Sequence, residues 1–245
     1  DSLSYQYVIR VRDFKGNKVV IQVPIDGTSD SIIKPKQIVP TDHFVQSNVA
    51  YTYEEGKYSI YVPKGALYDN AYMDITVDGD DLMLHNKELP VHKNIIVSYD
   101  LSAYAVEDRD KLYIARRAYK DVIYYTGARI KDGKLTASTR TLGDFTIAHD
   151  STPPLVTPKN VTDGKWMSKF DELVFEIDDE DSGISGYRAT VNGNFILMEY
   201  DYKTKRLVHD FNDNAVTDTE NNLKLIVTDN VGNSTIFETT FYRKR

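Results

Sequence analysis

The chain has 245 residues, 41% of them hydrophobic and 27% charged, which is typical of a folded globular protein of one large or two ordinary domains. Its net charge of -7 argues against a nucleic-acid partner, because phosphate binding needs clustered Lys and Arg. The lack of cysteine excludes disulfides and cysteine-ligated zinc, and no apolar stretch approaches the ~20 residues needed for a membrane span.

Alternation of apolar and polar residues with a period of two runs through the chain and predicts β-strands. In chain order, the predicted strands cover residues 5–11, 19–23, 58–62, 73–77, 95–99, 173–177, 187–191, 223–227 and 236–241. Asp132-Gly133 and Asn192-Gly193 predict tight two-residue turns, because these residue types accept positive φ angles. No segment carries a sustained helical stripe of apolar residues, so we expect helices to be short or absent.

One internal repeat links the two ends of the chain. Residues 9–17 (IRVRDFKGN) resemble residues 225–233 (LIVTDNVGN), and each copy ends one alternating strand and precedes another. The Asp can accept N–H bonds across the loop, while Gly and Asn tolerate left-handed backbone angles. Such hairpins commonly join the last two strands of bacterial immunoglobulin-like sandwiches. We therefore expect residues 1–26 to be the C-terminal hairpin of a truncated sandwich, marginal in water when alone.

Composition predicts the remaining domain boundaries. Residues 27–48 are rich in Ser, Pro, Lys and Asp and read as a linker, and residues 49–149 form a middle β-domain. Pro153 and Pro154 then break any strand, because proline cannot donate to a ladder. Residues 150–245 have the usual size of one immunoglobulin-like β-sandwich. The predicted fold class is all-β, with immunoglobulin-like β-sandwich modules in tandem.

The histidines give little sign of a metal site. No pair has the H-E-x-x-H spacing of a helix or the alternating H-x-H of a strand. His85 and His92 flank a loop that contains Pro90 and could approach each other, but ordinary loop histidines are the favoured interpretation. The five histidines are His43, His85, His92, His149 and His209.

The densest acidic cluster is the run at residues 178–181, Asp178-Asp179-Glu180-Asp181, followed by Ser182 and Gly183. Carboxylates in such a run could serve calcium, which takes six to eight oxygen ligands. The run lacks the spacing of an EF-hand loop, so a solvated loop between strands is the favoured interpretation. Whether residues 178–181 bind a cation is left open.

Two further patterns have both a functional and an ordinary interpretation. Residues 31–34 (SIIK) fit the S-x-x-K pattern of penicillin-binding enzymes, but the S-D-N and K-T-G partners are missing, so we treat the match as coincidence. Trp166, with Tyr200 and Tyr202 downstream, could form a platform for sugar rings. Such aromatic residues more often close the ends of a core.

Several strings occur together and in order along the chain. They are residues 62–69 (VPKGALYD), 140–145 (RTLGDF), 150–154 (DSTPP), 178–188 (DDEDSGISGYR) and 227–233 (VTDNVGN). Over nearly the whole chain they resemble the C-terminal accessory region of lysostaphin/LytM-type zinc metallopeptidases from Bacteroidetes. The resemblance implies a parent peptidoglycan endopeptidase whose catalytic domain binds zinc through an H-x-x-x-D motif and an H-x-H motif. We identify neither motif in this chain, so no catalytic, cofactor-binding or metal residue and no cofactor is carried over.

The function expected from this resemblance is that of a non-catalytic structural or targeting module of a cell-wall metallopeptidase. Such a module would position the enzyme or contact the cell envelope, in the periplasm or at the cell surface. Its expected partners are the catalytic domain absent from this chain and peptidoglycan or another envelope glycan. The alternative is an independent carbohydrate-binding or adhesion module of a bacterial surface protein, and an unrecognised hydrolase is the third interpretation.

Overall fold

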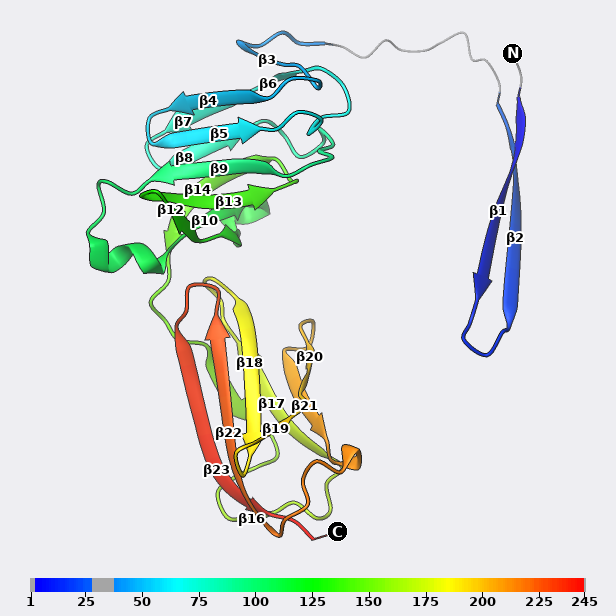
Figure 1. Cartoon of the computed structure of the whole chain (residues 1–245), viewed down its shortest axis with the longest axis vertical. Helices are drawn as coiled ribbons and strands as arrows, with labels where there is room; N and C mark the ends of the chain where they lie inside the picture. The colour runs from blue at the N-terminus through cyan, green and yellow to red at the C-terminus, as the bar shows by residue number, and fades with distance from the viewer. Residues whose placement is uncertain (1–2, 28–37, 245) are drawn as a thin grey trace. The chain divides into compact units, whose positions relative to one another are not determined.

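The computed structural model describes residues 3–27 and 38–244, except for the side chain of Asp121. Its contacts separate two units, which divide between Val39 and Pro40 (Figure 1). The first unit contains one antiparallel hairpin, made of β1 (Ser4–Arg12) and β2 (Lys18–Asp26). The S-x-x-K match at residues 31–34 lies outside the described residues.

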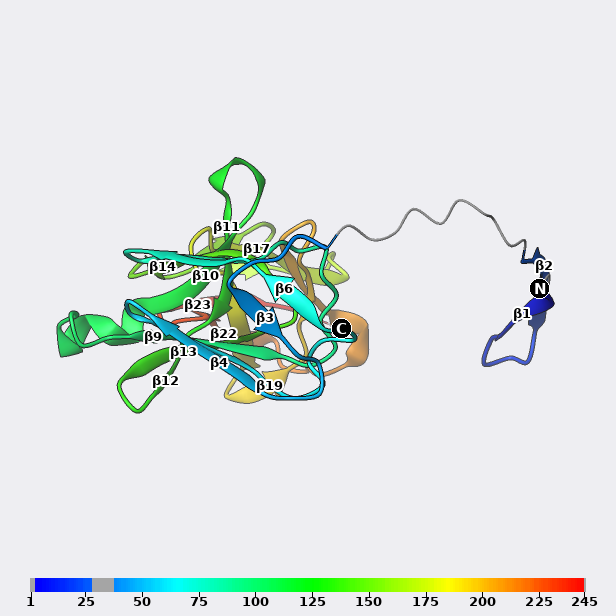
Figure 2. The same cartoon turned by 90° about the horizontal axis from the view of Figure 1, so that it is seen from above.

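The second unit begins with a middle domain of two five-stranded sheets. One sheet has the order β11-β10-β14-β8-β7, the other has the order β12-β13-β9-β5-β4, and β3 pairs with β6 beside them (Figure 2). The strands are β3 (His43–Val45), β4 (Tyr51–Glu55), β5 (Tyr58–Val62), β6 (Ala71–Met73), β7 (Ile75–Asp78), β8 (Asp81–Leu84), β9 (Ile95–Asp100), β10 (Leu112–Arg117), β11 (Ile123–Gly127), β12 (Arg129–Lys131), β13 (Lys134–Thr139) and β14 (Gly143–His149). Two short 3-10 helices, η1 (Val106–Lys111) and η2 (Tyr119–Asp121), flank β10.

A terminal domain follows, with a four-stranded sheet of order β15-β17-β21-β20 and a five-stranded sheet of order β16-β23-β22-β18-β19. Its strands are β15 (Leu155–Pro158), β16 (Lys165–Trp166), β17 (Glu172–Asp178), β18 (Ile184–Val191), β19 (Asn194–Ile196), β20 (Glu199–Asp201), β21 (Arg206–Asp210), β22 (Glu220–Asp229) and β23 (Ser234–Tyr242). One 3-10 helix, η3 (Phe211–Asp213), follows β21. The prediction of an all-β fold built from sandwiches is confirmed.

Each domain has its own hydrophobic core between its two sheets. In the middle domain, Ile60 and Val97 of one sheet pack with Phe145 of the other, and all three are buried. In the terminal domain, Phe175 on β17 packs into the same core as Leu225 on β22. The period-two pattern of the sequence therefore marks the inward faces of these strands.

The two predicted turns are present as two-residue hairpin loops. Asp132 and Gly133 have φ angles of 53° and 75° between β12 and β13, and Asn192 and Gly193 have 50° and 80° between β18 and β19. Two positive φ angles in succession give the type I′ geometry that suits the twist of paired strands.

The structure divides residues 73–77, which the sequence predicts as one strand. Met73 ends β6 and Ile75 begins β7, and these strands belong to different sheets. Asp74 between them pairs with His85: its carbonyl accepts the His85 N–H, and its own N–H donates to His85 Nδ1. A side chain thus takes the place of a backbone partner at this point, and the chain crosses from one sheet to the other.

β3 lies within residues 27–48, which the composition indicates as a linker. Val45 is completely buried in the core of the middle domain, and His43 pairs with Met73 across the β3–β6 ladder. The apolar residues here are too few to give a period-two signal, so their burial depends on a partner strand far along the chain.

A polar cluster around Asp80, which we call the Asp80 cluster, closes one end of the middle domain. Asp80 follows Gly79 in the turn between β7 and β8, and its carboxylate accepts from the hydroxyls of Tyr99 and Tyr104. Lys57 contacts the same carboxylate at 3.1 Å, and the Tyr58 hydroxyl donates to the Asp80 carbonyl at 2.6 Å. Tyr58 on β5 and Tyr99 on β9 belong to the sheet opposite β7, so the cluster links the two sheets.

No helix among the described residues has both the length and the apolar character that a transmembrane helix requires.

Candidate functional site

A buried polar arrangement in the second unit lies where the middle domain meets the terminal domain, and we call it the junction. Its centre is Asp150, which directly follows β14 and is 1% exposed. One carboxylate oxygen of Asp150 accepts from the Thr152 N–H at 2.9 Å, and the other accepts from the Ser182 N–H at 3.2 Å. The backbone of Asp150 donates to the Lys111 carbonyl at 2.9 Å. Asp150 therefore ties the end of one sandwich to a loop of the next.

The loop between β22 and β23 forms the second part of the junction. Asp229 is 1% exposed and accepts from the backbone N–H groups of Val231 and Asn233 at 2.9 and 2.8 Å. The Asn233 side-chain amide donates to the other Asp229 oxygen at 2.7 Å and also to the Asp150 carbonyl at 3.1 Å. This loop is one copy of the internal repeat, and its Asn reaches the chain that enters the terminal domain.

Apolar and polar contacts from β10 complete the junction. Tyr113 and Ala115 of β10 form a small buried cluster with Val231 of the terminal domain. The Tyr113 hydroxyl donates to the Asp181 carbonyl at 2.9 Å, and Lys111 donates to the Val231 carbonyl at 3.3 Å. Burial, followed by the nearby Asp181, Asp150 and Asp179 carboxylates, raises the pKa of Tyr113 to about 12. The hydroxyl therefore remains a hydrogen-bond donor at neutral pH.

The junction also gathers three carboxylates that the sequence separates widely. Asp150, Asp179 and Asp229 each place one oxygen so that all three oxygens lie within 4.8 Å of one another. Among the residues that the structure describes, this is the one group of three acidic or histidine side chains with the proximity that metal binding requires. Asp179 belongs to the acidic run at residues 178–181, but Asp150 and Asp229 were not among the predicted candidates.

The hydrogen bonds of these carboxylates favour a structural role. Asp179 accepts from the Gly183 N–H at 2.6 Å, and Asp150 and Asp229 accept from backbone amides as described above. Amide N–H groups stabilise the ionised form of a carboxylate and occupy lone pairs that a hard cation would use. Two neighbours of Asp179 in the run have other roles: Asp178 pairs with Lys205 at 2.5 Å, and Asp181 offers its carbonyl to Tyr113.

Burial, with a smaller contribution from the neighbouring carboxylates, raises the pKa of Asp179. Desolvation is the largest cause that raises its pKa, and the Asp150 and Asp229 carboxylates add to it, against the lowering effect of the Gly183 N–H. Between the ordinary value of 3.8 and the raised value, the folded protein binds more protons than the unfolded chain. The free energy of unfolding therefore falls as the pH rises through this window.

We expect Asp179→Asn to stabilise the protein at pH 7, because it removes a repelled charge and keeps an oxygen for the Gly183 N–H. The melting temperature should rise by about 1–3 °C, and the gain should shrink as the pH falls toward 3.8. Asp178→Asn is the matched control: it removes the partner of Lys205 and should lower the melting temperature slightly. A loss of stability with Asp179→Asn at pH 7 would contradict this account.

The histidines proposed as a pair have separate surroundings. His85 contacts Asp74, as described above, and His92 packs against the ring of Tyr68 at 5.3 Å. The structure therefore places each of them among its own neighbours, as expected for loop histidines.

His209 and Asp213 do have the H-x-x-x-D spacing, so the expectation that neither zinc-binding motif occurs in the chain is wrong for this one. The His209 ring is buried beside Phe211, its Nδ1 lies 2.9 Å from the Leu197 carbonyl, and Nδ1 lies 3.7 Å from an Asp213 oxygen. His209 is thus packed in the core with Nδ1 engaged by a backbone carbonyl, whereas Nε2 is buried without a hydrogen-bond partner among the described residues.

The aromatic residues proposed as a sugar platform do not form one group. Trp166 on β16 is 52% exposed and stacks on Tyr242 of β23, with ring centroids 5.4 Å apart and planes tilted by 32°. Tyr200 instead packs against Tyr187 in an edge-to-face pair, and Tyr202 is 71% exposed. Figure 1 shows β16 near the C-terminus and β20, which carries Tyr200, toward the other end of the domain. Tyr242 was missed because it follows Trp166 by 76 residues and meets it only through the parallel β16–β23 pairing.

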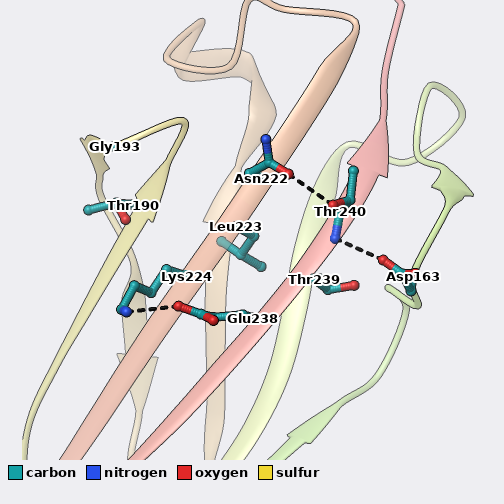
Figure 3. Close-up of a pocket in the computed structure, with 9 residues that line it drawn as sticks. All are labelled: Asp163, Thr190, Gly193, Asn222, Leu223, Lys224, Glu238, Thr239 and Thr240. Atoms are coloured by element: carbon teal, nitrogen blue, oxygen red, sulfur yellow. Dashed lines mark hydrogen bonds and ion pairs between the residues drawn. The ribbon is translucent and has the colours of Figure 1, made fainter.

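A polar pocket lies on the outer face of the β18–β22–β23 sheet, and its lining side chains already bind one another (Figure 3). The Thr240 hydroxyl donates to Asn222 at 2.9 Å, and the Thr240 N–H donates to Asp163 at 3.1 Å. Lys224 and Glu238 form an ion pair at 2.7 Å. Alternation along β23 places Thr240 and Tyr242 on the same side, so the pocket and the Trp166–Tyr242 pair share one face.

A family model matches the middle part of the chain. Residues 42–150 match the family model of the Zu5-like domain. This range covers the strands of the middle domain and ends at Asp150, the centre of the junction. No curated protein matches the chain.

Proposed function

We propose that this chain is a non-catalytic structural and targeting segment of a cell-envelope protein. The observation that carries the proposal is the junction. The middle and terminal domains are connected by the Asp150 N–H bond to the Lys111 carbonyl, by the bonds of Lys111 and the Tyr113 phenol to the terminal domain, and by a small apolar cluster. Loose linkers that merely connect domains have few contacts across the boundary, whereas this boundary is bonded from both sides.

The envelope setting of the proposal comes from the sequence strings. Their resemblance to the accessory region of LytM-type enzymes suggests a parent zinc metallopeptidase that acts on peptidoglycan, in the periplasm or at the cell surface. In that setting the bonded pair of sandwiches would act as one body that contacts the cell wall. The exposed loops at the sandwich ends are the natural places for contact with an envelope glycan.

The proposal is tested by incubating the chain with purified peptidoglycan sacculi, with and without zinc. We expect the chain to sediment with the sacculi, to release no muropeptide, and to keep its binding after Trp166→Ala. Release of soluble muropeptides would show an enzyme instead. Failure to sediment with the sacculi would reject the targeting role.

The second candidate is a carbohydrate-binding or adhesion module, favoured by the aromatic pair beside the polar pocket. An exposed Trp–Tyr stack offers an apolar surface for a sugar ring, and hydroxyl, amide and carboxylate groups nearby offer hydrogen bonds. This candidate requires retention on a soluble polysaccharide that is lost with Trp166→Ala. Tyr202→Ala, which changes a more exposed aromatic residue elsewhere in the domain, is the control.

The junction itself yields a prediction about rigidity. Tyr113→Phe keeps the ring in its cluster but removes the donor to the Asp181 carbonyl. We therefore expect the free energy of unfolding to fall by about 1–2 kcal/mol. Relaxation measurements by NMR should then show greater independent motion of the two domains, with both sandwiches still folded. Tyr124→Phe, on the neighbouring strand and exposed, should change neither quantity. Equal rigidity of Tyr113→Phe and wild type would remove this bond from the explanation.

A further inference from the structure

The β1–β2 hairpin has one apolar face that the described residues of its own unit leave exposed. Residues that pair directly across an antiparallel ladder share a face, and four successive pairs on this hairpin are wholly apolar. We call these eight residues the hairpin face, and each is between 40% and 62% exposed. They are Tyr5, Tyr7, Ile9, Val11, Val19, Ile21, Val23 and Ile25.

The opposite side of the same hairpin is mostly polar. It carries Ser4, Gln6, Val8, Arg10, Arg12, Lys18, Val20, Gln22, Pro24 and Asp26. The hairpin is therefore strongly two-sided, which is the pattern of a sheet that is solvated on one face and covered on the other. A continuous apolar patch of this kind on a folded protein usually marks a contact surface.

The loop of this hairpin repeats the loop of β22–β23 bond for bond. The Asp13 N–H donates to the Asn17 carbonyl at 3.1 Å, and the Asp229 N–H donates to the Asn233 carbonyl at 3.0 Å. The Asp carboxylates accept from the Asn backbone N–H at 2.8 Å in both loops, and from the Asn side-chain amide at 2.6 and 2.7 Å. Gly16 and Gly232 have φ angles of +90° and +84°.

Because the loops agree, the registers agree, and each residue of the first hairpin has an equivalent in the second. The pair Arg12 and Lys18 corresponds to Thr228 and Ser234, so Ile9 corresponds to Leu225 and Val11 to Val227. In the terminal domain these equivalent positions form the core, and Leu225 and Val227 are completely buried. There the sheet that contains β17 and β21 covers these positions, and β18 pairs with the edge of β22 that faces away from β23.

The size of the hairpin face disfavours pairing with a second copy of the chain. Two strands of nine residues make a face of about 30 by 10 Å, or roughly 300 Å². A stable interface between folded partners buries about 800 Å² on each side. A face of this size is sufficient only where strand pairing along the edges adds to it, as it does inside a single sandwich.

We infer that the hairpin face is the surface on which an incomplete immunoglobulin-like sandwich is completed, with β1 and β2 as its last two strands. The partner is a β-sheet with a mostly apolar inner face, like that of β17 and β21, together with a strand that pairs antiparallel to β1 as β18 pairs with β22. Its strands precede the hairpin in a longer form of the same polypeptide, since β22 and β23 likewise follow the strands that cover them. This inference is independent of the proposed function, because it concerns folding and not envelope contact.

The test compares the 245-residue chain with a form that is extended at its N-terminus by the preceding coding sequence. The extension has the same length as residues 151–219, which precede β22 in the terminal domain. Amide hydrogen exchange is measured at residues 4–26 in both forms. We expect exchange to be slowed by at least about 100-fold in the extended form, since sandwich strands open only with the whole domain. Ile9→Asn, which changes the hairpin face, should abolish the slowing. Gln22→Asn, which changes the opposite face, should preserve it.

Three outcomes would overturn the inference. The first is equal exchange at residues 4–26 in the two forms. The second is slowed exchange that survives Ile9→Asn. The third is protection in the 245-residue chain that rises with protein concentration together with a dimer in sedimentation, which would make a second copy the partner. The melting transition of residues 40–245 is the internal check that each variant is otherwise folded.

Discussion

Asp229→Ala is expected to destabilise the terminal domain by about 3–5 kcal/mol and to lower its melting temperature by roughly 12–40 °C. The carboxylate of Asp229 accepts three N–H bonds at a site that is 1% exposed. Alanine would leave the amides of Val231 and Asn233 buried without an acceptor, and each such group costs about 1–3 kcal/mol. The free Asn233 side chain would also lose the contact that aligns it with the Asp150 carbonyl.

The chain supplies its own control for this experiment. Asp13 makes the same bonds to Asn17 in the first hairpin, but it is exposed. Asp13→Ala should leave the melting of residues 40–245 within about 1 °C of wild type, because Asp13 belongs to the first unit and its bonds are exposed. A similar loss in the two variants would show that the effect of Asp229→Ala is not specific to the buried loop of the terminal domain.

The second large effect is expected in the Asp80 cluster. Asp80→Ala should destabilise the middle domain by about 2–3 kcal/mol, because it removes the acceptor of the buried Tyr99 hydroxyl and a partner of Lys57. The bond from Tyr99 is also the largest cause that holds the pKa of Asp80 below its usual range. This part of the stability is therefore present above pH 3.8 and is lost as the pH falls through the lowered pKa.

A double-mutant cycle isolates the bond between Asp80 and Tyr99. Tyr99→Phe alone should cost less than Asp80→Ala, because the remaining carboxylate is half exposed and keeps Lys57. The double variant should be more stable than the sum of the single losses predicts, by about 1–2 kcal/mol, since the second change no longer leaves a partner unpaired. Strict additivity, measured by denaturant unfolding, would show that the two side chains do not depend on each other.

Features within one or two neighbouring strands were predictable from the sequence. Alternation gave the β1–β2 and β22–β23 hairpins, and the Asp-Gly and Asn-Gly pairs gave two-residue turns with the expected positive φ angles. These features depend on residues close together along the chain, where turn chemistry and side-chain period act directly. The division of residues 73–77 was missed because a distant side chain, His85, takes part in it.

The junction could not be predicted for a similar reason. Asp150 is separated by 32 residues from its partner Ser182 and by 83 residues from Asn233. Each partner alone has the sequence context of an ordinary loop residue. The acidic run at residues 178–181 indicates a group of equivalent carboxylates. The structure shows that Asp179 alone of that run joins the carboxylate cluster. Contacts of this kind depend on which loops meet in space, and one sequence does not record that.

The way the terminal domain is attached has a consequence for how such proteins can be rearranged. Asp229, Asn233 and Ser182 all belong to the terminal domain, and they bind the chain at the point where it enters that same domain. Most residues of the junction thus belong to the terminal domain, and the middle domain contributes Lys111 and the β10 surface around Tyr113. Recombination that moves the terminal domain as one cassette, beginning at Asp150, would carry its own docking residues into a new host chain.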